Sequence, residues 1–176
     1  YVPALVAREF RESRLVVFST LCVYHFAPVV QHGWDESVEP GPLGDYANSC
    51  VGRERAFAYG SHQWGTPGRL MRLNYAIDMR YGVLIDIANW VMQEQPIPIA
   101  TGHASVIWQG DVNVQMLRTF RHCSTPTSPL NIGGPELASV RMLAHEFGKR
   151  FGKTPRFDGV EQPDAWVNNT LQAQRL

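Results

Sequence analysis

The feature that most constrains the fold is a short apolar run, LVVF at residues 15–18, which follows a helical pattern in the first residues. The run contains two β-branched residues and ends before the polar Ser19 and Thr20. These properties are typical of a strand that is buried on both faces of a parallel sheet. A second strand is predicted over residues 69–76, RLMRLNYA.

Helices and short strands alternate along the rest of the chain. An irregular loop at residues 25–45 precedes a helix that starts near Tyr46. Asp111 and Ser139 are good N-caps for two later helices. The remaining predicted elements are helices at 83–92, 112–120 and 140–151, and short strands at 97–100, 105–108 and 129–134. This alternation predicts an α/β fold whose C-terminal third is more mixed.

The composition excludes several classes of function. The chain has 16 Lys and Arg against 16 Asp and Glu and no basic stripe, which argues against a nucleic-acid partner. No segment is apolar over the length of a membrane span, so we expect no membrane partner. Cys22, Cys50 and Cys123 have no C-x-x-C spacing, which predicts reduced cytoplasmic thiols and no metal site.

Two hydroxyl-bearing residues stand where a parallel sheet binds ligands. Thr20 ends the first predicted strand, and Tyr46 begins the next long helix. Strand ends and helix starts border the ligand crevice of a doubly wound sheet, so the two hydroxyls are expected to meet there. A tyrosine can move a proton at an alcohol or carbonyl, but its free pKa of about 10 must be lowered for this. The alternative is that Thr20 only ends a strand and Tyr46 only packs.

Five segments then occur in a fixed order: VVFSTLCVY, Tyr46, RLN, IWQGD and LNIGGPELASVRMLAHEF. Together they resemble the extended short-chain dehydrogenase/reductase family, the NAD-dependent epimerases and dehydratases, many of which act on nucleotide sugars. The resemblance runs from about residue 1 to about residue 155. It implies a partial Rossmann-like, doubly wound parallel sheet with a small mixed α/β substrate-binding region. Residues 1–80 would be the C-terminal half of the cofactor domain, and residues 81–176 would mainly bind substrate.

The resemblance also implies roles for individual residues. The family's Ser/Thr that hydrogen-bonds the reacting oxygen falls on Thr20, and the family's acid/base tyrosine falls on Tyr46. Ser19 and Leu73 fall beside the cofactor. Asn74, in the segment after the next strand, falls beside the substrate.

The first departure from the family pattern, Tyr-x-x-x-Lys, is at Cys50. The lysine lowers the tyrosine pKa by its charge and holds the cofactor ribose, and a neutral thiol does neither. Arg53 lies one turn further along the same helix face and is the candidate that supplies charge to Tyr46. The alternatives are that Arg53 is a solvated surface residue, and that Cys50 is a nucleophile or a small buried side chain.

The second departure is the lack of a Gly-rich phosphate turn, because no G-x-G-x-x-G occurs in the chain. We therefore expect NAD or NADP in a complete enzyme and no dinucleotide bound to this chain alone. The chain also starts without Met and within a helical pattern, which suggests that its beginning lies elsewhere.

The third departure concerns the substrate. Many nucleotide-sugar enzymes of the family carry an Arg where this chain has Ala104. His103 is adjacent but is a poorer diphosphate ligand than Arg, which binds phosphate through two hydrogen bonds. Arg80 is the residue that could compensate, so we assign it to the substrate.

Three functions of different classes remain open from the sequence. The first is the C-terminal part of an NAD(P)-dependent epimerase, dehydratase or reductase, which acts on a sugar or a related alcohol or carbonyl compound and is inactive as this chain alone. The second is a non-catalytic binding module or remnant of that family. The third is an interaction protein, a homo-oligomer whose exposed sheet edge is covered by self-association.

Overall fold

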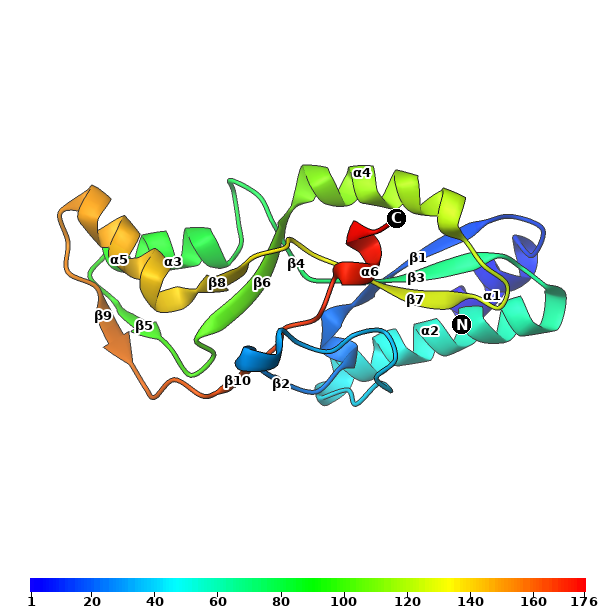
Figure 1. Cartoon of the computed structure of the whole chain (residues 1–176), viewed down its shortest axis with the longest axis horizontal. Coiled ribbons are helices and arrows are strands. Elements are labelled where there is room, and N and C mark those ends of the chain that lie inside the picture. The colour runs from blue at the N-terminus through cyan, green and yellow to red at the C-terminus, as the bar shows by residue number, and fades with distance from the viewer.

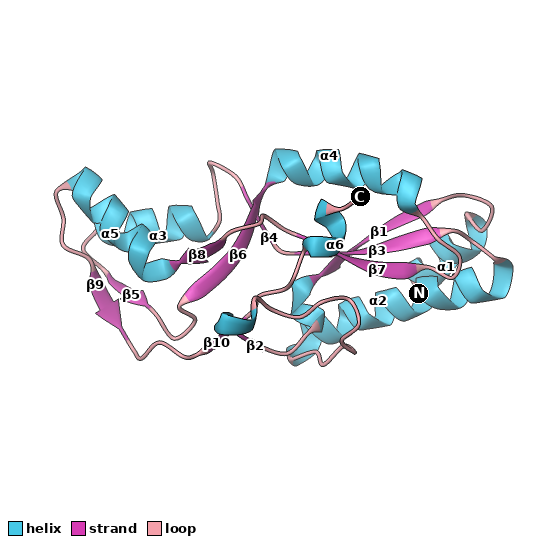
Figure 2. Ribbon diagram, in the orientation of Figure 1, coloured by secondary structure: helices cyan, strands magenta, loops and turns pink.

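The computed structural model describes all 176 residues. Figure 1 shows an elongated molecule with a parallel sheet and its helices at one end and a smaller group of helices and strands at the other. Figure 2 shows how strands alternate with helices in both parts. None of the helices is both long enough and apolar enough to span a bilayer.

The larger part is built on three parallel strands. They are β1 (Leu15–Thr20), β3 (Gly68–Leu73) and β7 (Ser128–Ile132), in the order β1-β3-β7. The predicted strand at residues 15–18 is therefore confirmed. Its predicted burial on both faces is wrong, because β1 is an edge strand and the Phe18 side chain is 41% exposed.

Helices cover both faces of this sheet. Helices α1 (Val2–Glu9) and α2 (Gly44–Trp64) pack on each other and lie on one face, and α4 (Gln109–Thr119) lies on the other, as Figure 1 shows. Val112 of α4 packs with Met71 and Leu130 of the sheet. The first residue of α4 is Gln109, so Asp111 is not its N-cap, and the carboxylate lies within its first turn.

The smaller part contains a mixed sheet and a helix pair. Strand β4 (Tyr75–Ile77) runs parallel to β6 (His103–Trp108), and β8 (Leu137–Ser139) runs antiparallel to β6. Strands β5 (Pro96–Pro98) and β9 (Arg156–Asp158) form a separate pair. Helices α3 (Val83–Met92) and α5 (Val140–Phe151) pack together over a core around Ile87 and Ala144. Ser139 caps α5 as predicted, because its side chain accepts a hydrogen bond from the Met142 N–H.

The predicted strand at residues 69–76 is divided at Asn74 between two sheets. The Asn74 N–H still donates to the carbonyl of Ile132 in the larger part, at 2.8 Å. Tyr75 then pairs with Val106 of β6 in the smaller sheet. No Gly or Pro marks the division in RLMRLNYA, so the sequence does not indicate the change of partner.

The loop at residues 25–45 is tied to the C-terminal segment. It contains β2 (Ala27–Pro28) and the short helix η2 (Val29–Gln31), and β2 pairs with β10 (Asp164–Ala165). The remaining short elements are η1 (Leu21–Val23), η3 (Phe120–His122) and α6 (Leu171–Gln174). The loop at residues 25–45 and the C-terminal segment are therefore joined through the β2–β10 pair.

A buried ion pair connects α2 to the parallel sheet. Arg72 of β3 donates from Nε and Nη2 to the two carboxylate oxygens of Glu54, at 3.1 and 2.8 Å, and each residue is 5% exposed. The Ser19 hydroxyl of β1 donates to the same carboxylate. Arg72 Nη1 also donates to the Tyr24 hydroxyl at 2.7 Å, and that hydroxyl donates to Asn131 Oδ1 at 3.0 Å. All the principal polar atoms of the pair therefore have partners, as a buried charge requires.

We expect replacement of only one partner of this pair to destabilise the fold strongly. Glu54→Gln or Arg72→Met leaves an uncompensated buried charge, which costs about 3–5 kcal/mol. The double variant Glu54→Gln/Arg72→Met should lose less than the sum of the two single losses. Urea unfolding measures each value, and the exposed pair Glu146–Lys149 supplies a control whose variants should unfold close to the parent. Additive losses would contradict direct coupling of Glu54 and Arg72.

We also expect the buried Tyr24, one of the six tyrosines, to ionise only at a raised pH. Burial raises the pKa of the Tyr24 hydroxyl above 10.0, although Arg72 acts in the opposite direction. The folded pKa is the higher one, so the contribution of Tyr24 to stability is complete below the unfolded pKa of about 10 and is lost as the pH rises through the folded value. Absorbance at 295 nm follows the titration. Tyr24→Phe should remove the late phase, and a late phase that persists in this variant would contradict the assignment to Tyr24.

Candidate functional site

Thr20 closes β1 with its side chain buried beside the next turn. The residue is 7% exposed, and its Oγ1 accepts a hydrogen bond from the Cys22 N–H at 3.2 Å, which caps η1. This bond uses one acceptor site of the hydroxyl and leaves its proton free to be donated. Thr20 also pairs in register with Leu73 of β3, so the structure brings these two predicted residues together.

Tyr46 lies in the first turn of α2 with its side chain 65% exposed. The interpretation of Tyr46 as a core packing residue is therefore wrong. Its carbonyl accepts the Ser49 hydroxyl at 2.7 Å, which fixes the backbone of that turn. The phenol is open to a ligand at the surface.

Cys50 points away from that surface. It is 1% exposed and packs with Val23, Tyr24 and Val51. This confirms the small buried side chain and contradicts the nucleophile, because the thiol is sealed in an apolar cluster. Tyr46 and Cys50 are separated by one turn, yet their side chains have opposite exposure.

Arg53 is half-buried. Its Nη2 donates to the Cys50 sulfur at 3.2 Å, and its Nε is buried with no hydrogen-bond partner. Cys50 therefore anchors a cation on α2. The unpartnered Nε is a free donor at this position.

Ser19 is not available in the way that the resemblance implies. Its hydroxyl is committed to Glu54 in the buried network, and it is paired in register with Arg72. Leu73 is partly buried and packs on the opposite face, in the cluster beneath α4. Since adjacent strand residues point to opposite faces, Ser19 and Leu73 do not converge on one ligand.

Asn74 and Arg80 differ in their surroundings. Asn74 is 4% exposed, and neither its amide oxygen nor its amide nitrogen has a partner. It lies against Gly133, where an added Cβ would come within 2.2 Å of the Asn74 nitrogen. Arg80 is exposed and binds Asp78 through Nε and Nη2, both at 3.0 Å. That pairing holds the pKa of the Asp78 carboxyl below its usual value.

The sequence did not predict a polar cluster that lies in the smaller part of the molecule. Glu161 accepts Arg141 Nε at 2.9 Å, and its other oxygen lies 3.5 Å from His103 Nδ1. This second separation is within the range of an ion pair but is long for a hydrogen bond, and Nδ1 is otherwise unpartnered. Glu161 lies in a segment without a periodic pattern, so only its charge could have indicated it.

The donor groups of this chain do not fit a dinucleotide by themselves. Cys50, where the resemblance places a lysine, faces the core, and the Ser19 hydroxyl is already bonded. Arg53 offers charge, but the chain has no Gly-rich turn to hold a pyrophosphate. No group of three His, Cys, Asp or Glu side chains is placed to hold a metal ion.

Comparison with known proteins identifies the fold. No family model and no curated protein sequence matches the chain. Among solved structures, Thermus thermophilus UDP-glucose 4-epimerase in complex with NAD superposes with a TM-score of 0.77 and 17% identity, over 98% of this chain and 61% of that one. Bacillus anthracis dTDP-glucose 4,6-dehydratase in complex with NAD gives 0.79 and 14%, over 99% and 58%.

Bacillus cereus UDP-glucuronic acid 4-epimerase, in complex with UDP-glucuronic acid and NAD, gives a TM-score of 0.79 and 17% identity, over 99% of this chain and 59% of that one. The chain therefore has the fold of NAD-dependent epimerases and dehydratases, and it spans about three-fifths of the length of these structures. The predicted fold class, α/β with a Rossmann-like parallel sheet and mixed strands, is confirmed.

We expect a lysine at position 50 to destabilise the fold, because the Cys50 side chain is buried. Cys50→Lys would bury an ammonium group among apolar side chains, at a cost of several kcal/mol. The matched control is Ser49→Lys, one residue earlier on the exposed side of α2. Urea unfolding should show a large loss for the first variant and little change for the second. Equal stability of the two variants would contradict the burial of this position.

Proposed function

We propose that this chain is the proton-transfer and substrate-binding part of an NAD(P)-dependent epimerase, dehydratase or reductase. The substrate is a sugar or a related alcohol or carbonyl compound, and the chain is inactive alone. The observation that carries the proposal is the exposed phenol of Tyr46 at the start of α2, in a fold that epimerases and dehydratases share. We retain residues 1–80 as the cofactor-domain part and residues 81–176 as the mainly substrate-binding part.

The proposed chemistry is proton transfer at one substrate oxygen. Tyr46 gives a proton to that oxygen or takes one from it, and the Thr20 hydroxyl donates a hydrogen bond to the same oxygen. In a complete enzyme the nicotinamide cofactor would accept and return a hydride. Asn74 supports substrate binding because its buried amide has no partner within the chain.

Arg53 is the residue proposed to assist Tyr46. A cation near a phenol lowers the pKa of the phenol because it stabilises the phenolate. The Cα atoms of the two residues are about 10 Å apart along the helix, and helical side chains in general lean toward the N-terminus, which is the direction of Tyr46 from Arg53. The bond to Cys50 holds the guanidinium on this helix.

The second candidate is a non-catalytic binding module. The observation that favours it is the buried Cys50 in place of the lysine, together with Ser19 committed to Glu54. The third candidate is self-association along β1, which is supported by the edge position of that strand and the exposure of Phe18.

Calorimetry separates these candidates first. We expect no binding of NAD or NADP to residues 1–176, and micromolar binding would contradict the proposal that the cofactor half is separate. A strand, Gly-rich turn and helix encoded in frame upstream of the Tyr1 codon would mean that this chain is a fragment of a complete enzyme. Light scattering that finds only monomers would exclude the third candidate.

In a form that includes this Gly-rich segment, Tyr46→Phe should reduce kcat by at least about 100-fold, because it removes an acid/base group. The control is Tyr59→Phe, on the same helix with the same 65% exposure. Turnover is followed by NADH absorbance or by product analysis with UDP-glucose. Retained activity in Tyr46→Phe would exclude the tyrosine mechanism. Sugar binding without turnover in the parent protein would favour the binding module.

A further inference from the structure

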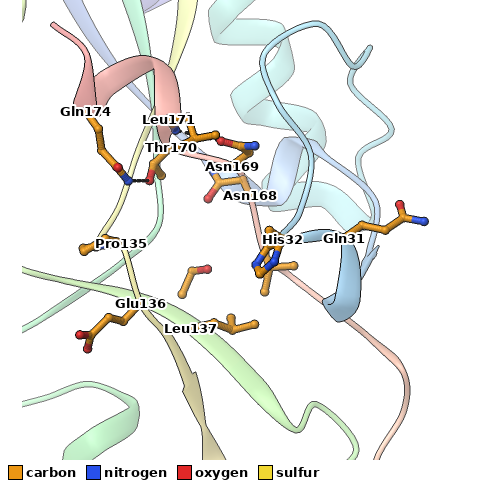
Figure 3. A pocket seen from close by; sticks show the side chains of 13 residues that line it. Gln31, His32, Pro135, Glu136, Leu137, Asn168, Asn169, Thr170, Leu171 and Gln174 are labelled. Carbon is orange, nitrogen blue, oxygen red and sulfur yellow. Dashed lines mark hydrogen bonds between the residues drawn. The ribbon is translucent and has the colours of Figure 1, made fainter.

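A second candidate site is a cavity that neither Thr20 nor Tyr46 lines. It has a volume of about 360 Å³ and is bordered by the end of η2, residues 134–137 and residues 167–171. Figure 3 shows side chains from these segments around the cavity. None of the residues assigned above to cofactor, substrate or proton transfer lines it. The volume is near the lower end of the usual range for ligand pockets, about 300–1,000 Å³, which suits a molecule of monosaccharide size.

The amide of Asn168 lies in the wall of this cavity without a hydrogen-bond partner. The residue is 6% exposed, and both its Oδ1 and its Nδ2 are unpartnered. Its backbone is held on the other side, because Asn168 forms a β-bridge with Trp34 and the backbone of Gly33 packs against it. Figure 3 shows the Asn168 side chain directed toward the space bordered by Pro135 and His32. A buried amide normally has partners, so this one indicates a ligand that supplies them.

The wall that carries Asn168 is held by its own hydrogen bonds. The Asn169 carbonyl accepts a bond from Asn131 Nδ2 at 3.0 Å, which connects the wall to the buried network. Gln174 Nε2 donates to Thr170 Oγ1 at 3.0 Å, the bond drawn in Figure 3. The opposite wall includes Ser105 of β6, which is 7% exposed. The two hydrogen bonds therefore fix the residues that follow Asn168 in this wall.

The chemistry of the lining identifies the ligand class. No Lys or Arg lines the cavity, and its ionisable side chains are His32 and Glu136. It contains no Phe, Tyr or Trp ring on which a base could stack. Amide and hydroxyl groups both donate and accept hydrogen bonds, as the hydroxyls of a sugar do. We propose that this cavity binds a small uncharged polyhydroxy compound, a monosaccharide or sugar alcohol, through Asn168 and Ser105.

The test uses the ¹⁵N-labelled 176-residue chain, D-glucose and sorbitol as probes, and amide chemical shifts as the readout. We expect saturable shifts at the Asn168 side-chain amide and at the Ser105 backbone amide. Asn168→Leu should weaken binding about tenfold through the loss of its hydrogen bonds. Asn113→Leu, on the exposed side of α4, is the matched control and should bind like the parent.

Ser105→Ala gives an independent test if Asn168→Leu does not fold, and it should also weaken binding. Three results would overturn the proposal: no saturable shift with either probe, unchanged binding in the folded variants, or saturation of the same signals by inorganic phosphate. Tyr46 does not line the cavity, so a lack of sugar binding there would leave the proposed function in place. Equally, a result that excludes proton transfer by Tyr46 would leave sugar binding in the cavity in place.

Discussion

The ion pair between Glu54 and Arg72 holds the larger part of the molecule together. Two charges are removed from water at the junction of α2 and the parallel sheet, and the desolvation is tolerated because Ser19 and Tyr24 complete their hydrogen bonds. Such a pair adds little net stability, but it strongly disfavours any arrangement that separates its members. It therefore fixes the position of α2 on the sheet. Tyr46 is placed by the same constraint, because it lies eight residues earlier on that rigid helix.

The hydrogen-bond network of this ion pair extends to the wall of the cavity that contains Asn168. The Tyr24 hydroxyl accepts a hydrogen bond from Arg72 and donates one to Asn131. The side-chain nitrogen of Asn131 donates in turn to the carbonyls of Trp34 and Asn169. These carbonyls belong to the loop after β2 and to the C-terminal segment, which are distant in sequence. One buried polar chain thus orders the surroundings of both candidate sites. Buried polar networks of this kind are costly when incomplete, which favours one arrangement of the loops.

Helix α2 presents different chemistry on its different sides. Cys50 faces an apolar cluster, Arg53 lies at the boundary with its sulfur contact, and Tyr46 is open to solvent. A lysine at this position would change more than the charge, because the Cys50 side chain points into the core. A cation for Tyr46 must come from Arg53 or from outside the chain. The proposed catalytic role therefore depends on Arg53, and the non-catalytic binding module stays an alternative.

The sequence by itself determined the α/β class, the strand at residues 15–18, the cap at Ser139 and the five segments that resemble the epimerase fold. These signals are local, because they depend on periodicity, capping and short motifs. Tertiary structure alone decided that the chain changes sheets at Asn74, that Phe18 lies at an open edge and that Ser19 faces Glu54. It also placed Asn168 without a partner in a cavity. Those outcomes depend on contacts between residues far apart in the chain, which neither spacing nor composition records.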